Sequence, residues 1–267
     1  MLPEINIGPL TLQTFGISFA LAFVAAGALI YRRLEELGKP PDWAYEIGFS
    51  ALAGGLVGSR LDFILENYDS VKGDLLGNIF SGSGLVWYGG AIGGALAVFA
   101  WAWWRGYLGL ALLDLAAPAL AIGYAIGRIG CQLSGDGDYG RAWDGPWAMS
   151  YPDGTVPTDQ TVHPTPVYET IVMGLVALGL WRLRGRLRPG LLFALYLVLA
   201  GSERFLVEFV RRNDDVALGL TQAQLFSVAM ILGGGVWLAV AARGGGIRLS
   251  AGEAAAAATS SPSRTTS

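Results

Sequence analysis

The sequence predicts an all-α membrane protein with seven transmembrane helices, and three observations support this fold class. Hydrophobic residues make up 53% of the 267 residues, and the mean hydropathy is +0.47. Charged residues make up only 15%, whereas a soluble domain carries roughly 25%. The 39 glycines and 9 tryptophans are typical of a membrane helix bundle, because glycine permits close helix packing and tryptophan favours the water interface.

Seven apolar stretches are long enough to cross a bilayer, which requires roughly 20 mostly apolar residues. They cover residues 11–31, 43–66, 85–104, 108–134, 166–181, 190–209 and 222–242. We predict that these spans form one transmembrane catalytic domain over residues 1–243. Residues 244–267 are rich in Gly, Ala, Ser and Thr without apolar periodicity, so we expect a disordered cytoplasmic tail.

The basic residues of the loops predict the orientation, because such residues stay preferentially on the cytoplasmic side. One set of loops carries Arg32, Arg33, Lys39, Arg105, Arg182, Arg184, Arg186, Arg188, Arg243, Arg248 and Arg264. The opposite set carries only Lys72, Arg141, Arg211 and Arg212. We therefore expect the N-terminus outside, the C-terminus inside, and the loop over residues 135–165 on the outer side.

Three arginines, Arg60, Arg128 and Arg204, lie inside the predicted spans 2, 4 and 6, each in the outward half of its helix. A charge in a span costs about 2.5 to 3.5 kcal/mol, so each should have an anionic partner or a polar cavity. One explanation pairs them with nearby carboxylates: Asp62, Glu203 or Glu208. For all three together we favour a phosphate-binding cavity, because guanidinium presents a planar fork of donors to phosphate oxygens.

A glycine-rich turn follows Arg128 and extends to Arg141. It brings Asp136 and Asp138 to the mouth of the expected cavity. A hard cation is the alternative reading of Asp-x-Asp, but the further oxygen ligands and trailing Glu of a calcium loop are missing, so we predict no metal. Cys131 is read as a small buried residue.

The segment His163-Pro-Thr-Pro-Val-Tyr168-Glu169 lies at the outer entrance of span 5, where Pro166 suits the first turn of a helix. A lone histidine beside a helix start is often only a hydrogen-bonded structural residue. His163 is nevertheless the one histidine in the chain and lies on the same side as the arginines, so it is a candidate base. Tyr168 and Glu169 follow within the first turn.

Two further patterns concern spans 6 and 3. Arg204 and Glu208 are four residues apart on one helix, a spacing that favours an ion pair. Span 3 begins Trp87-Tyr88, which places a phenol at the same outer level, although an interfacial aromatic belt is ordinarily the preferred explanation for these two residues. The glycines of span 3 predict close helix packing: Gly89, Gly90, Gly93 and Gly94.

Together these motifs resemble the prolipoprotein diacylglyceryl transferase family over nearly the whole chain. The resemblance rests on Gly-Arg-x-Gly at 127–130, His-Pro-x-x-x-Tyr-Glu at 163–169 and Arg-Phe-x-Val-Glu-Phe-x-Arg at 204–211. It implies transfer of the diacylglyceryl group of phosphatidylglycerol to the lipobox cysteine of a secreted preprotein, with glycerol phosphate released. It also implies a bacterial inner-membrane enzyme with its active site on the periplasmic side, and signal peptides and membrane lipids as partners.

The resemblance also assigns roles to individual residues. Arg128 and Arg204 match two essential arginines, Asp136 stands where a glutamate is usual, Gly140 matches a functional glycine, and Glu208 matches a partner acid. We expect a substrate-binding set that also includes Arg60, Tyr168 and Glu169. We expect no cofactor, and no nucleic acid as partner, because 18 basic and 21 acidic side chains are nearly balanced.

Three positions depart from the family pattern. Tyr88 stands where the family usually has a histidine, which is the proposed catalytic base. Cys131 replaces an asparagine, and Ala200 replaces a tyrosine. The sequence therefore resembles a divergent branch of the family, in which the base is His163, Tyr88 or Asp136, or in which the acceptor has changed. Two other functions stay open at this point: an arginine-lined transporter of anions or lipids, and a relative that binds lipid or lipoprotein without turnover.

Overall fold

The computed structural model describes residues 1–68, 86–244 and 246. Lys72, Arg248, Arg264 and nearly all of the expected tail lie outside these residues, so the predictions about them are untested. Within the described part, seven long helices form, as expected: α1 (Thr14–Glu36), α2 (Trp43–Glu66), α5 (Trp87–Trp104), α6 (Leu110–Ser134), α7 (Thr165–Leu183), α8 (Leu191–Val207) and α9 (Gln222–Arg243).

The helices confirm a predominantly helical fold, and five of them are long and apolar enough to cross a membrane: α1, α2, α6, α7 and α9. The helices α5, with 18 residues, and α8, with 17, are the two shortest of the seven. That these two also cross the membrane, and that the N-terminus lies outside, stay predictions.

The chain forms two compact units. One comprises Met1–Ile30 together with the chain from Leu113 onward, and the other comprises Tyr31–Leu112. Each is described by itself below, and the single domain over residues 1–243 stays a prediction.

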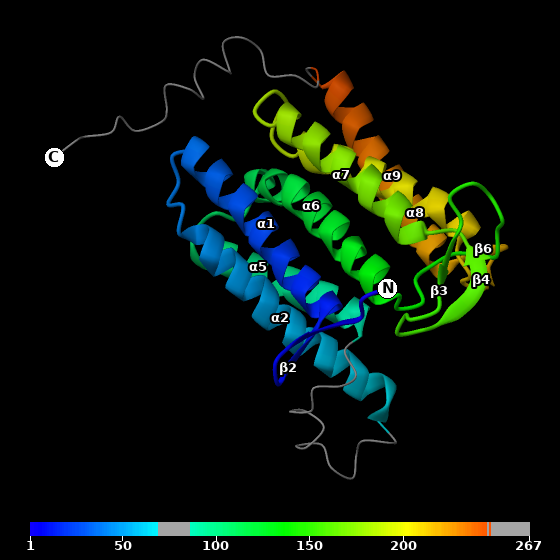
Figure 1. Cartoon of the computed structure of the whole chain (residues 1–267). Coiled ribbons are helices and arrows are strands. Elements are labelled where there is room, and N and C mark those ends of the chain that lie inside the picture. Colours follow the sequence, from blue (N-terminus) through cyan, green and yellow to red (C-terminus); the bar gives the residue numbers. More distant parts are fainter. Residues whose placement is uncertain (69–85, 245, 247–267) are drawn as a thin grey trace. The chain divides into compact units, whose positions relative to one another are not determined.

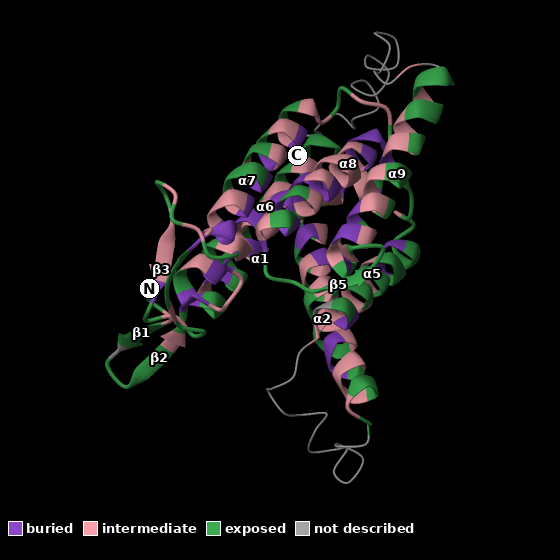
Figure 2. Cartoon of the chain, turned by 90° about the vertical axis from the view of Figure 1, so that its right-hand side faces the viewer, coloured by how far each residue is buried: buried purple, intermediate pink, exposed green. Residues whose placement is uncertain are grey.

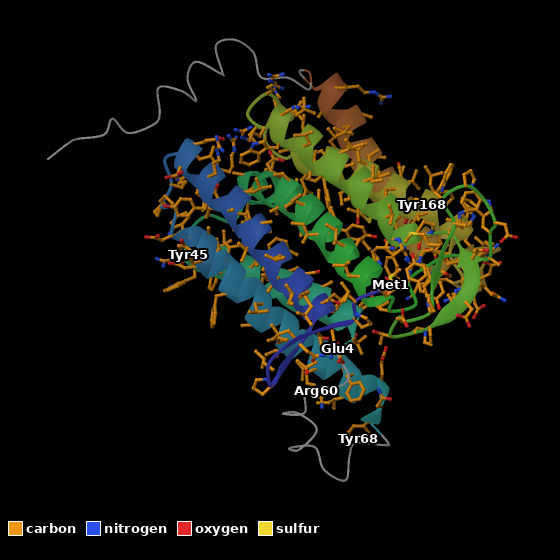
Figure 3. The ribbon with its side chains drawn as sticks, viewed as in Figure 1. Met1, Glu4, Tyr45, Arg60, Tyr68 and Tyr168 are labelled. Carbon is orange, nitrogen blue, oxygen red and sulfur yellow. The ribbon has the colours of Figure 1, made fainter. Side chains whose placement is uncertain are left out.

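In the unit Tyr31–Leu112, α2 and α5 pack closely through glycines, which confirms the packing predicted for span 3. A Cβ added at Gly58 would lie 2.2 Å from the carbonyl oxygen of Gly89, and one at Gly93 would lie 2.3 Å from that of Gly54. The start of α5 is held by Asp62, whose Oδ2 accepts a hydrogen bond of 2.8 Å from the Gly89 N–H. Arg60 is buried near the end of α2 (Figure 3), with its guanidinium 4.9 Å from the ring centre of Phe63.

In the larger unit, the core lies among α6, α7 and α8, and Figure 2 shows buried residues along these helices. Small side chains at four-residue spacing on α6, Ala117, Ala121 and Ala125, allow α7 and α8 to approach. Larger side chains then fill the space between the helices: Met173, Leu180 and Leu192.

In the described part of the chain, three short antiparallel hairpins, which the all-α prediction omitted, lie between or before the helices. They pair β1 (Glu4–Ile7) with β2 (Leu10–Gln13), β3 (Met149–Tyr151) with β4 (Thr158–Val162), and β5 (Asp215–Ala217) with β6 (Leu220–Thr221). A 3-10 turn, η1 (Glu208–Val210), follows α8. Figure 1 shows the β3–β4 hairpin and β6 at the same end of α7, α8 and α9, where the candidate site lies.

Candidate active site

An arginine–carboxylate cluster lies where α6, α7 and α8 meet the β3–β4 and β5–β6 hairpins. Its members are Arg128 from α6, Asp138 from the turn after it, Glu169 from α7, Arg204 from α8, and Glu208 and Arg211 around η1. Arg128 and Arg204, which the sequence placed on separate helices at one depth, therefore share one site.

Glu169 is the centre of the cluster. Its carboxylate is fully buried, with 0% exposure, and it contacts all three guanidinium groups. Arg128 pairs with it through Nε, Arg204 lies 3.3 Å away through Nη1, and Arg211 lies 3.2 Å away through Nη1. One buried carboxylate thus fixes the direction of three cations.

Glu208 holds the opposite side of Arg204. Its Oε2 lies 2.9 Å from Arg204 Nη2, which confirms the pairing expected from the four-residue spacing. Its Oε1 accepts hydrogen bonds from Asn213 Nδ2 at 2.6 Å and from Thr221 Oγ1 at 2.9 Å. Because Thr221 also caps the start of α9, the position of Arg204 is tied to α9 as well as to α7.

The acid that completes the cluster is Asp138. It pairs with Arg128 through Oδ2, and its Oδ1 accepts a hydrogen bond of 2.5 Å from Arg211 Nη2. Burial raises the pKa of Asp138, but Arg128 and Arg211 outweigh this effect and hold its pKa below the ordinary value. The cluster therefore combines three guanidinium groups with three carboxylates.

Asp136, which the resemblance places at the position of an essential glutamate, lies beside the cluster, and its carboxylate faces the backbone of Asp138. Its Oδ1 accepts a 3.2 Å hydrogen bond from the Asp138 N–H, and burial raises its pKa. Cys131, Asp136 and Asp138 offer three ligand atoms within 4.8 Å of one another, but both oxygens of Asp138 already contact arginines. These contacts favour an ion-pair role for Asp138 over metal binding.

Sequence reasoning counted Arg211 as an outer loop residue, and it placed Asp138 at the mouth of the cavity together with Asp136 but gave a role only to Asp136. The signal for Arg211 was available: Arg204, Glu208 and Arg211 follow i, i+4, i+7 spacing and therefore lie on one side of a continuing helix. No comparable periodicity distinguishes Asp138 from Asp136.

Gly140 lies at a point where two backbone segments touch. Its N–H donates a hydrogen bond of 2.8 Å to the carbonyl of His163, and an added Cβ would lie 2.4 Å from the carbonyl oxygen of Val210. Because that neighbour is backbone, it cannot move aside as a flexible side chain would. A glycine is therefore required here to keep the Asp138 turn against η1.

Gly140→Ala is expected to destabilise the protein by about 1 to 3 kcal/mol, the usual cost of overpacking a closely packed position. The midpoint of thermal unfolding in detergent measures this loss. The matched control is Gly174→Ala on α7, where an added Cβ has nothing within 4 Å, and there we expect no loss. Equal stability of the two variants would contradict the required close approach.

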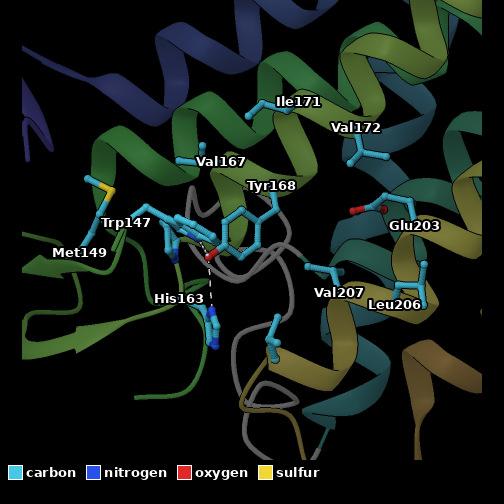
Figure 4. Close-up of a pocket in the computed structure, with 12 residues that line it drawn as sticks. Trp147, Met149, His163, Val167, Tyr168, Ile171, Val172, Glu203, Leu206 and Val207 are labelled. Carbon is cyan, nitrogen blue, oxygen red and sulfur yellow. Dashed lines mark hydrogen bonds between the residues drawn. The ribbon is translucent and has the colours of Figure 1, made fainter. Parts of the chain in front are cut away.

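A pocket of about 760 Å³ lies between α7, the end of α8 and the segments around Trp147 and His163 (Figure 4). We call it the α7–α8 pocket. Its lining is mostly apolar, with polar groups from His163, Tyr168, Trp147 and Glu203. Tyr168 and Glu203 each immediately precede a cluster residue, Glu169 and Arg204. The pocket therefore lies directly against the cluster.

His163 reaches this pocket from the strand-to-helix turn before α7. Its ring stacks on Trp143, with ring centres 4.4 Å apart and planes at 10°, and its Nδ1 lies 3.2 Å from the Tyr168 hydroxyl. That hydroxyl also accepts a hydrogen bond of 2.7 Å from Trp147 Nε1. Partial burial lowers the pKa of His163 below its ordinary value, so the neutral imidazole predominates at pH 7.

Arg60 and Tyr88, the remaining site candidates, belong to the unit Tyr31–Leu112. Tyr88 lies at the second position of α5 with 37% exposure. That either residue joins the arginines in one cavity stays a prediction.

Comparisons with known proteins agree on one family. The family model described as prolipoprotein diacylglyceryl transferase matches residues 4–240. A phosphatidylglycerol–prolipoprotein diacylglyceryl transferase of Methylococcus capsulatus is 34% identical over 252 residues, covering 89% of this chain and 94% of the relative. Similar enzymes of Dehalococcoides mccartyi, 33% identical over 85% of this chain and 88% of the relative, and Clostridium tetani, 30% identical over 84% and 90%, also match.

Proposed function

The chain belongs to the prolipoprotein diacylglyceryl transferase family, and from that premise we propose that it transfers the diacylglyceryl group of phosphatidylglycerol to a prolipoprotein. The acceptor is the thiol of the lipobox cysteine, and the reaction serves lipoprotein maturation. The observation that carries the proposal is the shared site of Arg128 and Arg204, oriented by Glu169 beside an apolar pocket. This combination suits a phospholipid, in which a phosphate is joined to uncharged groups.

The arginines bind the phosphate and stabilise the charge that develops on it. The thiolate sulfur attacks the glyceryl carbon that carries the phosphate ester, a C–S bond forms, and the C–O bond breaks. Glycerol phosphate leaves with the bonding electron pair and gains a negative charge. Arg204, whose side chain is 24% exposed, and Arg128, at 15%, are the more accessible guanidinium groups of the cluster. Pre-oriented donors of this kind often supply the largest share of catalysis.

We assign the proton acceptor to His163. The thiol must lose its proton, because thiolate is the nucleophile. The neutral imidazole lines the pocket, and in the tautomer that donates Nδ1–H to the Tyr168 hydroxyl, Nε2 is able to accept the proton. Tyr88 is the alternative by position, and Asp136 by its raised pKa.

The direct test of the transferase function uses purified protein with labelled phosphatidylglycerol and a lipobox peptide. We expect the label of the diacylglyceryl group on the peptide cysteine, and none on a peptide in which that cysteine is serine. Binding of the lipid without transfer would favour the non-catalytic relative, and movement of lipid across a vesicle membrane without transfer would favour a transporter.

We further propose that the enzyme lies in the bacterial inner membrane with the cluster on the periplasmic side, as the distribution of loop basic residues suggests. In a Cys131→Ser background, Asp153→Cys is expected to react with an impermeant thiol reagent added to whole cells. Lys39→Cys, on the predicted cytoplasmic side, should react only after lysis. Both positions are exposed, so accessibility itself does not separate them. The reverse labelling pattern would overturn the orientation.

A further inference from the structure

Glu203 is a buried acid without a protein partner. It is 8% exposed, and Figure 4 shows its carboxylate directed into the α7–α8 pocket. Across residues 1–68, 86–244 and 246, no side chain or backbone group makes a hydrogen bond or ion pair with it, although Arg204 is the next residue. A buried, unpaired carboxyl group costs free energy, so the fold itself gains nothing from it.

The walls around Glu203 cannot satisfy it. The nearby lining comes from α7 and the end of α8 and is aliphatic: Val172, Leu206, Val207 and Val210. The polar groups of the pocket, His163, Tyr168 and Trp147, hydrogen-bond or stack with one another near its outer loops. Among the described residues no hydrogen-bond donor reaches Glu203, so a ligand in the pocket can supply the donors.

The helix geometry indicates which part of a ligand arrives there. Consecutive residues on a helix point about 100° apart, so α8 presents Arg204 to the cluster and Glu203 to the pocket. On α7, Glu169 likewise faces the cluster and Tyr168 faces the pocket. A phosphate on Arg204 therefore places the group attached to it next to Glu203. That group must donate hydrogen bonds and carry no negative charge, because a second anion would be repelled.

We propose that Glu203 selects the lipid headgroup by accepting hydrogen bonds from the two free hydroxyls of the glycerol of phosphatidylglycerol. The inference rests on the proposed function and deepens it, since it adds a binding residue for the donor lipid. A carboxyl group offers two acceptor oxygens, which match the two hydroxyls of a 1,2-diol. A site built to bond a hydroxyl discriminates strongly against an analogue that lacks it, because its own polar group is then left unpaired.

The protein should tolerate the loss of this carboxyl group. Glu203→Leu replaces an unpaired buried acid with an apolar side chain of similar size in aliphatic surroundings, so we expect the thermal midpoint to stay equal or rise. Glu203→Gln, which keeps the shape and one acceptor, should behave in the same way. These two variants therefore separate a lost headgroup contact from a lost fold.

The experiment compares two donor lipids with identical acyl chains in micelles free of other lipids: phosphatidylglycerol, and phosphatidylpropanol, which lacks both hydroxyls. For the wild type we expect kcat/KM with a lipobox peptide to favour phosphatidylglycerol by at least about 10²-fold. Glu203→Leu should abolish this preference by lowering the value for phosphatidylglycerol alone. Asp215→Asn, which removes an exposed carboxylate of the same unit, should keep it.

Two results would overturn the proposal: equal use of both lipids by the wild type, or a loss in Glu203→Leu that is the same for both lipids. The second result would assign Glu203 to the proton transfer instead. Failure of the proposed function gives a different result, since the wild type then transfers from neither lipid. In that case we compare the binding of the two lipids in micelles. Tighter binding of phosphatidylglycerol than of phosphatidylpropanol, if Glu203→Leu removes the difference, still supports the headgroup contact. Equal binding of the two lipids refutes it.

Discussion

Arg128→Lys and Arg204→Lys are each expected to lower transferase turnover by about 10² to 10³-fold, the loss typical when one donor that stabilises a developing anion is removed. Each arginine spans two carboxylates, Asp138 and Glu169 for Arg128, and Glu169 and Glu208 for Arg204. A lysine can keep one of these contacts as a point charge. It cannot keep both and still present a fork of donors to phosphate.

The measurement is turnover per folded molecule, with thermal unfolding recorded beside it. Arg243→Lys, an exposed position at the end of α9, is the matched control and should leave both quantities unchanged. If the Lys variants of Arg128 and Arg204 unfold at lower temperature but retain full turnover per folded molecule, the arginines are structural ion-pair partners, and the phosphate site lies elsewhere.

His163→Gln is expected to cost about 10²-fold or more in turnover while lipid binding is retained, the usual contribution of a general base. The pH profile gives a second test. Burial holds the pKa of His163 below its ordinary value of 6.5, so the wild type should keep the basic form at neutral pH and lose turnover as the pH falls through that lower pKa. The acid limb due to His163 should be absent from the glutamine variant.

Variants of Tyr88 separate the two candidate bases. Tyr88→Phe should cost less than His163→Gln, and Tyr88→His should be tolerated or should restore turnover to the His163 variant. An inactive Tyr88→Phe beside a nearly unaffected His163→Gln would assign the base to the phenol or to Asp136. Absence of turnover in every form, Tyr88→His included, would indicate a protein that binds lipid without catalysis.

The positions of the helices were readable from the sequence because the signal for each is local and long. An apolar run of about 20 residues can satisfy its backbone groups within a bilayer only as a helix, so composition alone locates it. The Arg204–Glu208 pair was predictable for the same reason, since four-residue spacing fixes proximity on one helix. The hairpins were not, because strands of two to five residues carry too little pattern.

The membership of the site depended on tertiary structure. Arg211 meets Asp138 across 73 residues of sequence, and Glu169 meets Arg204 across 35. The choice of Asp138 over Asp136 depends on the turn over residues 135–138, in which Gly135 and Gly137 adopt φ of +58° and +95°. Glycine permits many such turns, so spacing does not determine which carboxylate faces inward.

Glu203 shows the same division between sequence and structure. Its neighbours in sequence made an ion pair with a buried arginine plausible, since charge and proximity along the chain are all that a sequence records. Arg204 is instead occupied by Glu169 and Glu208, and the rotation of α8 turns Glu203 toward the apolar pocket. The sequence by itself located the helices and identified Arg128, Arg204 and Glu208 as candidate site residues. Only the packing of α7 against α8 decided which side chains face the arginine–carboxylate cluster and which face the pocket, because that depends on how far each helix is rotated about its axis.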